Sequence, residues 1–255
     1  MNHDSTTILE WTYEPLDFFE EPMDVEILSD SVHMEGGKVR GDFTKAESQM
    51  GSKFKNQAHA ELERLFASQQ IATGKKLRLS GAILIHELPD GIRVVYTSAN
   101  MTGRATLTGR IEAITRDKDG NIISETRADR LEEQRKFREK VARCIADFPE
   151  PGQNILAMQA CLQKSFDDEI NCFLYLYEIR DRLETIFGNQ RKAKRFLGET
   201  DWRKLGELAN DPTSAASRHR GRATDHRPPS PSTLREGREA ARHLIVAYVD
   251  HLCRS

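Results

Sequence analysis

The spacing of apolar residues changes halfway along the chain, and this change constrains the fold more than any other feature. Between Leu77 and Ile85, apolar side chains alternate with polar or small ones, as in a strand with one buried face. After Leu131 they recur at steps of three and four residues, as in amphipathic helices. We therefore predict an α+β protein: an N-terminal antiparallel sheet with one long helix in residues 1–126, then a C-terminal all-α helical bundle in residues 127–255.

Turn residues divide the first half into strands. Gly36 and Gly37 permit the positive φ angles of a hairpin, which predicts paired strands at residues 24–31 and 38–43. Pro-Asp-Gly at residues 89–91 and Asp-Gly at residues 119–120 predict an antiparallel meander from residue 76 to residue 123. One apolar stripe runs along residues 45–70, so we expect a helix there that covers one face of the sheet.

Capping residues predict the ends of the helices in the second half. Helices are expected at residues 131–148, 154–187, 190–197, 201–209 and 233–253. Asn154 is positioned to cap the second of these, Gly188 to end it, and Thr233 with Glu236 to open the last as a capping box. A basic, proline-rich loop at residues 211–232 precedes the last helix.

Composition and motifs exclude several classes of protein. The four cysteines lack CxxC spacing, which favours a reduced, cytoplasmic protein without a disulfide framework or a zinc ribbon. The longest apolar run, residues 244–249, is too short to span a bilayer, so we expect no membrane partner. We find no HExxH, Walker, dinucleotide or GxSxG motif, and we predict neither a metal nor a cofactor.

Charge is separated along the chain. Residues 1–37 contain ten acidic side chains and no Lys or Arg, so the remainder carries +8 although the whole chain sums to −2. The acidic segment also contains aromatic residues: Trp11, Tyr13, Phe18 and Phe19. Two alternatives follow: the segment docks a partner through these rings, or it packs the rings on the sheet and leaves its carboxylates in water. The basic remainder suits an anionic partner.

The basic loop is the best candidate site. Long loops without secondary structure inside compact domains are commonly functional or disordered. Its candidate phosphate- or partner-binding residues are Arg218, His219, Arg220, Arg222 and Arg227. Our leading hypothesis is a non-catalytic binding protein whose loop contacts RNA or an acidic protein, with less support for DNA.

Two Arg/His pairs suggest an alternative, catalytic hypothesis. The pairs are Arg220 with His226 and Arg238 with His243. A metal-independent ribonuclease needs an imidazole to move a proton and a guanidinium to stabilise charge on phosphate oxygens. Arg238 and His243 point about 140° apart on a helix, so they would meet only across a homodimer interface or through bending.

A resemblance supports this alternative. Residues 176–181 (LYEIRD), 202–210 (WRKLGELAN) and 218–221 (RHRG), followed by an amphipathic helix, resemble the C-terminal part of a group of uncharacterised bacterial proteins. The arrangement over residues 154–255 is similar to HEPN domains, helical bundles that include ribonucleases with an Arg-x4-6-His motif near the last helix. The resemblance implies an endoribonuclease in which His226 or His243 transfers the proton. Gly221 departs from the motif, where a polar residue usually follows the arginine.

A third hypothesis places a helix-turn-helix at residues 191–210. In this interpretation, a DNA major groove is contacted by Arg203, Lys204, Glu207 and Asn210. The alternative is that the two short helices only pack Phe196, Leu197, Trp202 and Leu205 into the bundle.

Overall fold

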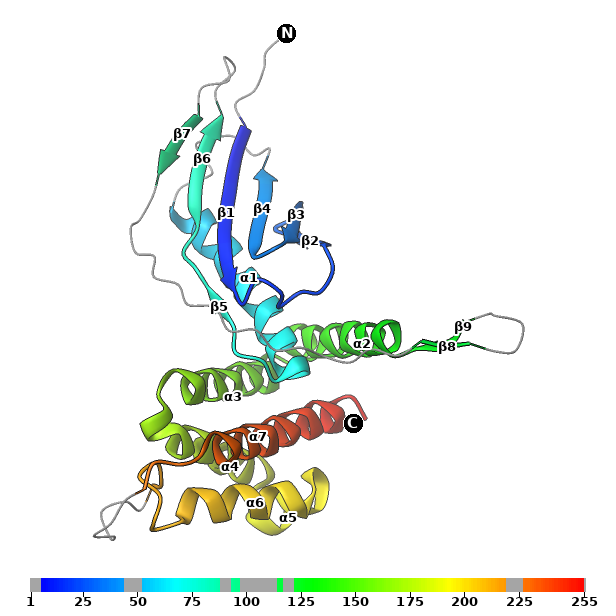
Figure 1. Cartoon of the computed structure of the whole chain (residues 1–255). Coiled ribbons are helices and arrows are strands. Elements are labelled where there is room, and N and C mark those ends of the chain that lie inside the picture. The colour runs from blue at the N-terminus through cyan, green and yellow to red at the C-terminus, as the bar shows by residue number, and fades with distance from the viewer. Residues whose placement is uncertain are drawn as a thin grey trace. The chain divides into compact units, whose positions relative to one another are not determined.

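The computed structural model describes residues 6–43, 52–87, 93–96, 114–116, 122–218 and 227–254 (Figure 1). It confirms the α+β class, because an antiparallel sheet is followed by a helical region. The chain divides into two compact units. The first comprises Met1–Phe66 and Leu77–Ile111, and the second comprises Ala67–Lys76 and Glu112–Ser255.

The sheet of the first unit is built around its N-terminal strand. Its strands are β1 (Thr6–Glu14), β2 (Met23–Ile27), β3 (Asp30–Glu35), β4 (Lys38–Phe43), β5 (Arg78–Leu79), β6 (Ile83–Glu87) and β7 (Arg93–Tyr96). The strand order is β2-β3-β4-β1-β6-β7, and β5 pairs with the last residues of β1. Strand β1 is therefore central, with Leu9 opposite Gly41 of β4 and Leu84 of β6.

The aromatic residues of the acidic segment are part of the core. Trp11, Tyr13 and Phe18 are each 1% exposed. Tyr13, Phe19 and Phe66 pack edge to face, with ring centroids 5.1–5.6 Å apart. These rings are not available to a partner, so the packing alternative is the correct one, and the partner-docking alternative is wrong.

The first two hairpins differ in how well the sequence predicts them. Gly36 and Gly37 join β3 to β4 as expected, with φ of 54° and 84°. The strand expected at residues 24–31 is instead broken at Leu28 and Ser29, which adopt φ of 52° and 72° and reverse the chain between β2 and β3. The carboxylate of Glu61 accepts the backbone N–H of Leu28 at 3.0 Å. The sequence does not reveal this turn, because Leu and Ser rarely adopt positive φ.

Helix α1 (Ser52–Thr73) supplies the layer that covers the sheet within the first unit. Phe54, Ala58, Leu62 and Phe66 recur at the predicted spacing and lie in one buried cluster with the inward side chains of the strands. Residues 44–51, where we expected the helix to begin, lie outside the described residues. Its last turns, from Ala67, belong to the second unit.

The predicted meander does not continue as one sheet. Strands β8 (Ile114–Arg116) and β9 (Ile122–Glu125) pair with each other and form a separate two-stranded sheet in the second unit. The turns expected at residues 89–91 and 119–120 lie outside the described residues. Alternation of apolar residues predicts strands, but it does not say which strands share a sheet.

The second unit is a bundle of helices. They are α2 (Thr126–Asp147), α3 (Pro149–Asp167), the short 3₁₀ turn η2 (Glu169–Asn171), α4 (Cys172–Phe187), α5 (Gln190–Leu197), α6 (Glu199–Asn210) and α7 (Pro231–Leu252). Helix α7 packs against α3, α4 and α6 (Figure 1). Gly188, at φ of 80°, ends α4 as predicted. None of the described helices is long and apolar enough to cross a membrane.

Two predicted helix starts are wrong for the same reason. Helix α3 begins at Pro149 and not at Asn154, and α7 begins at Pro231. Proline suits the first turn of a helix, where its missing N–H costs nothing. The N-cap of α7 is Ser230, whose hydroxyl accepts the N–H of Thr233 at 3.1 Å, so the expected capping box is not used.

Candidate functional site

The two ends of the basic loop are fixed to each other. Ser214 and Arg227 form a parallel bridge. The N–H of Arg227 donates to the Thr213 carbonyl, and the N–H of Ala215 donates to the Arg227 carbonyl, both at 2.9 Å. Arg227 itself is exposed. The loop therefore leaves and re-enters the bundle through one ordered base.

Arg218 directly precedes residues 219–226 of the loop, and several contacts hold it in place. Its backbone N–H donates to the Ala209 carbonyl at 3.0 Å, and its Nε donates to the Asn210 Oδ1 at 2.8 Å. Its Cζ lies 3.8 Å from the centroid of the Tyr177 ring. The residue is exposed, so an ordered guanidinium is presented to solvent.

Behind Arg218 lies a series of stacked rings and guanidiniums. The Cζ of Arg180 is 5.0 Å from the centroid of Tyr177 and 5.0 Å from the centroid of Trp202. With its amide oriented so that the oxygen faces both donors, Gln190 accepts from Arg180 Nη2 at 2.6 Å and from Trp202 Nε1 at 3.0 Å. We refer to Trp202, Arg180, Tyr177 and Arg218 as the cation–π chain. It links α6 and α4 to the start of the basic loop.

The Arg180 side chain lies inside the bundle. It is 8% exposed, its Gln190 partner is neutral, and its Nε has no partner among the described residues. Gly206 makes room for it, because a Cβ there would overlap Nη1 and lie 3.3 Å from Cζ. Asp181 interacts electrostatically with both Arg180 and Arg218. A buried charge is screened less than a solvated one, so the field of Arg180 adds to that of Arg218 at the loop base, and the Asp181 carboxylate offsets part of it.

A small cavity opens beside this base. Its volume is about 160 Å³. Its polar lining consists of one guanidinium, one carboxylate and four hydroxyl groups, from Arg227, Asp211, Thr213, Ser214, Ser230 and Thr233. Hydroxyls and guanidinium N–H groups are the donors that commonly bind phosphate oxygens.

His219, Arg220, Arg222 and His226 lie outside the described residues. The pairing of Arg220 with His226 therefore remains a prediction.

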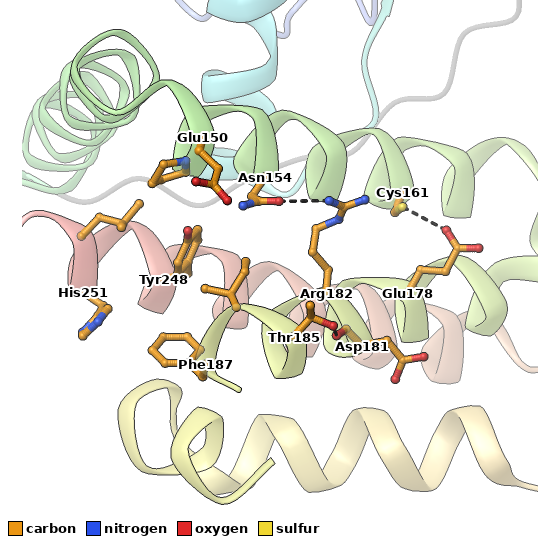
Figure 2. A pocket seen from close by; sticks show the side chains of 13 residues that line it. Glu150, Asn154, Cys161, Glu178, Asp181, Arg182, Thr185, Phe187, Tyr248 and His251 are labelled. Carbon is orange, nitrogen blue, oxygen red and sulfur yellow. Dashed lines mark hydrogen bonds between the residues drawn. The ribbon is translucent and has the colours of Figure 1, made fainter. Parts of the chain in front are cut away.

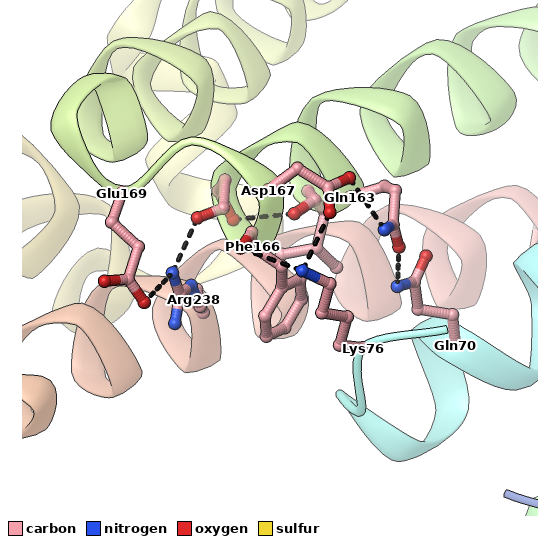
Figure 3. Close-up of polar contacts among 9 residues, drawn as sticks. Gln70, Lys76, Gln163, Phe166, Asp167, Glu169 and Arg238 are labelled. Atoms are coloured by element: carbon pink, nitrogen blue, oxygen red, sulfur yellow. Dashed lines mark hydrogen bonds and ion pairs between the residues drawn. The ribbon is translucent and has the colours of Figure 1, made fainter. Parts of the chain in front are cut away.

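The second Arg/His pair is separated within one chain. Arg238 Nη2 donates to the Ser165 carbonyl at 2.6 Å, and its guanidinium lies 4.5 Å from the centroid of Phe166 (Figure 3). His243 Nδ1 instead lies 3.4 Å from the carboxylate of Asp201 on α6. The two side chains therefore contact different helices of the bundle.

Like Arg238, two neighbouring cations donate to backbone carbonyls near the C-terminal ends of helices. Lys76 Nζ donates to the Phe166 carbonyl at 3.2 Å and pairs with Asp167 at 2.8 Å, at the C-terminal end of α3 (Figure 3). Arg242 Nη1 donates to the Ile71 carbonyl at 3.4 Å, near the C-terminal end of α1. Cations at these positions satisfy terminal carbonyls and complement the negative end of the helix dipole.

A larger groove lies between α3, α4 and the last turns of α7 (Figure 2). Its volume is about 890 Å³. Arg182 Nη1 donates to Asn154 Oδ1 across it at 3.0 Å. Its acidic lining consists of Glu150, Glu178 and Asp181, and its aromatic end of Phe187, Tyr248 and His251. Three carboxylates outweigh one guanidinium, so the groove does not suit the anionic partner that the basic loop predicts.

Each residue assigned to a major groove pairs with a neighbouring side chain. Arg203 pairs with Glu207 at 3.6 Å, and Lys204 pairs with Glu236 of α7 at 2.5 Å. Asn210 accepts the hydrogen bond from Arg218. Leu197, Trp202 and Leu205 are buried, but Phe196 is 49% exposed, contrary to expectation. The burial of Leu197, Trp202 and Leu205 favours the packing interpretation of α5 and α6.

Neither a metal-binding cluster among the described residues nor a match to a known protein identifies the site. Among the described residues, no three His, Cys, Asp or Glu side chains are grouped so that they could hold a metal ion. Comparisons of the chain with protein-family models, with curated proteins and with solved structures find no match. The resemblance of residues 154–255 to HEPN domains therefore remains a prediction.

Proposed function

We propose that the second unit is a non-catalytic binding domain that holds the phosphate backbone of RNA at the base of the loop between α6 and α7. The observation that carries this proposal is the fixed, exposed guanidinium of Arg218. Ala209, Asn210 and Tyr177 hold it in place before any ligand arrives. A side chain that is already ordered loses little conformational entropy on binding, and its planar N–H groups match phosphate oxygens.

The other end of the loop supports the same interpretation. Arg227 is exposed, its backbone is paired with Thr213 and Ala215, and it lines the hydroxyl-rich cavity. The sequence between Arg218 and Arg227 adds Arg220 and Arg222. Four arginines on one loop give the charge density that backbone recognition requires.

Binding without catalysis is favoured over the ribonuclease alternative. Catalysis by Arg238 and His243 would need a second subunit, since their contacts lie on different helices. Arg238 also has a structural role at the C-terminal end of α3. Catalysis by Arg220 and His226 rests on the sequence alone.

A titration of labelled single-stranded RNA in EDTA tests the proposal. We expect Arg218→Ala to weaken binding about 10-fold or more, because a hydrogen bond to a charged group is worth about 1.5–3 kcal/mol. The slope of log K against log salt should become less negative by about 0.7, the value for one lost phosphate contact on a single strand. Arg203→Ala is the matched control: it removes another exposed arginine of the bundle and should leave both quantities unchanged.

Each other outcome contradicts a specific part of the proposal. Fragments ending in 2′,3′-cyclic phosphate would replace it with the ribonuclease alternative. Loss of sequence-specific DNA binding in Arg203→Ala would favour the helix-turn-helix. Binding to polyglutamate but not to RNA would make the partner an acidic protein.

A further inference from the structure

Two thiols from different helices lie against each other in the second unit. The Sγ atoms of Cys144 in α2 and of Cys253, the C-cap of α7, are 3.1 Å apart, and both cysteines are free. One turn away, Lys140 and Asp250 join the same two helices by an ion pair of 2.5 Å. Since a disulfide needs about 2.05 Å between sulfurs, the pair is roughly 1 Å from bonding distance.

We propose that Cys144 and Cys253 are a redox-reactive pair that closes an intramolecular disulfide when the protein meets a small disulfide oxidant. In the first step the thiolate of Cys253 attacks glutathione disulfide and releases one glutathione thiolate. In the second step the thiolate of Cys144 attacks the Cys253 sulfur of the mixed disulfide and releases the second. The protein dithiol loses two electrons and two protons, and one glutathione disulfide becomes two glutathione thiols.

Burial decides the order of these steps. Cys253 is exposed, whereas Cys144 is 1% exposed. Burial, together with its contact to Cys253, raises the pKa of the Cys144 thiol to about 12. Cys253 therefore meets the oxidant first, and Cys144 serves as the resolving thiol.

The other two cysteines provide an internal comparison. Cys161 donates a hydrogen bond to Glu178 at 3.3 Å, and Cys172 is fully buried in the core. Burial raises the pKa of each to about 11. Neither has the exposed neighbouring sulfur that Cys144 has, so we expect both to stay as thiols.

The bond would act on the end of α7. His251 and Leu252, which directly precede Cys253, line the groove between α3, α4 and α7. Helix ends are the regions that most easily unfold locally. A covalent link to α2 should therefore fix this end of the helix and the groove wall that it forms.

Intact mass measured after incubation with glutathione disulfide and removal of the oxidant tests the proposal. Wild type and the control Cys161→Ser should each lose about 2 Da, the mass of the two hydrogens removed per disulfide. Cys253→Ser and Cys144→Ser should not. Cys253 is exposed, so its serine variant tests the proposal even if Cys144→Ser fails to fold.

Hydrogen exchange provides the second measurement. Oxidised wild type should exchange the amides of residues 249–254 at least several-fold more slowly than reduced protein, and Cys253→Ser should show no such difference. Alkylation by iodoacetamide checks that the Cys253 thiol is accessible. If Cys253 is readily alkylated and the mass of wild type is unchanged by glutathione disulfide, the proposed bond is overturned. Mass loss that persists in Cys253→Ser would assign the reaction to other thiols. Oxidation without slower exchange would overturn the proposed effect on α7.

Discussion

Replacing Gly206 by Ala tests whether the buried guanidinium of Arg180 organises the bundle. Alanine in a helix is ordinarily about 1 kcal/mol more stable than glycine. Here the new Cβ would overlap Arg180 Nη1 and lie 3.3 Å from Cζ, whereas unstrained heavy-atom contacts are about 3.5–4.0 Å. The guanidinium must therefore move away from Gln190 and from the rings of Tyr177 and Trp202.

The cost of that movement exceeds the gain in helix propensity. The hydrogen bond from the charged Arg180 to Gln190 contributes about 1.5–3 kcal/mol. Each desolvated cation–π contact contributes up to about 2 kcal/mol. If the displaced side chain loses the hydrogen bond and one ring contact, the net loss in the free energy of unfolding is about 2–4 kcal/mol.

Urea denaturation followed by tryptophan fluorescence measures this loss. A lower midpoint with an unchanged slope would identify a change in stability. In a double-mutant cycle, Gly206→Ala introduced into Arg180→Ala should be neutral or stabilising by up to about 1 kcal/mol, because the clash is gone. A Gly206→Ala protein as stable as wild type, or destabilisation that persists without Arg180, would refute the reasoning.

Three further substitutions probe the second unit. Gly237→Ala should destabilise it by about 1–3 kcal/mol, because the added Cβ would lie 2.6 Å from Cε1 of Phe173; an unchanged urea midpoint would contradict this packing. Ser230→Ala should cost about 1 kcal/mol in thermal unfolding, since it removes the N-cap of α7; no change would leave Thr233 as the capping residue. Hydrogen bonds from Asn171 lower the pKa of Asp168, so its stabilising effect is present above the ordinary Asp pKa of about 4 and is lost as pH falls through the lowered value. Asp168→Asn should remove this part of the acid sensitivity below the ordinary Asp pKa of about 4, and an identical acid transition would contradict it.

Local patterns predict the elements of this fold well. The change from alternation to a three-and-four spacing separates the sheet from the bundle, because both patterns follow directly from backbone geometry. Gly188 and the Gly36-Gly37 turn are confirmed, since glycine readily adopts the positive φ that each position requires. The turn at Leu28 and Ser29 escapes prediction, because tertiary contacts hold residues there that do not favour it alone.

The candidate site is less predictable, because its parts meet only through packing. Tyr177 and Arg180 are three residues apart on one helix, which places them on the same face. Nothing in the sequence shows that Trp202 and Arg218 approach that face from other elements. The sequence singles out Arg218 for its charge, but the structure adds what fixes it in place.

Neutralising the basic loop entirely tests most directly whether this loop holds an anionic backbone. Fluorescence anisotropy with single-stranded RNA would compare wild type with a variant in which four arginines become Gln: Arg218, Arg220, Arg222 and Arg227. We predict a loss of affinity of at least 100-fold and a salt slope less negative by up to about 2.8, or 0.7 for each phosphate contact. A folded variant with the affinity and salt slope of wild type would contradict the account.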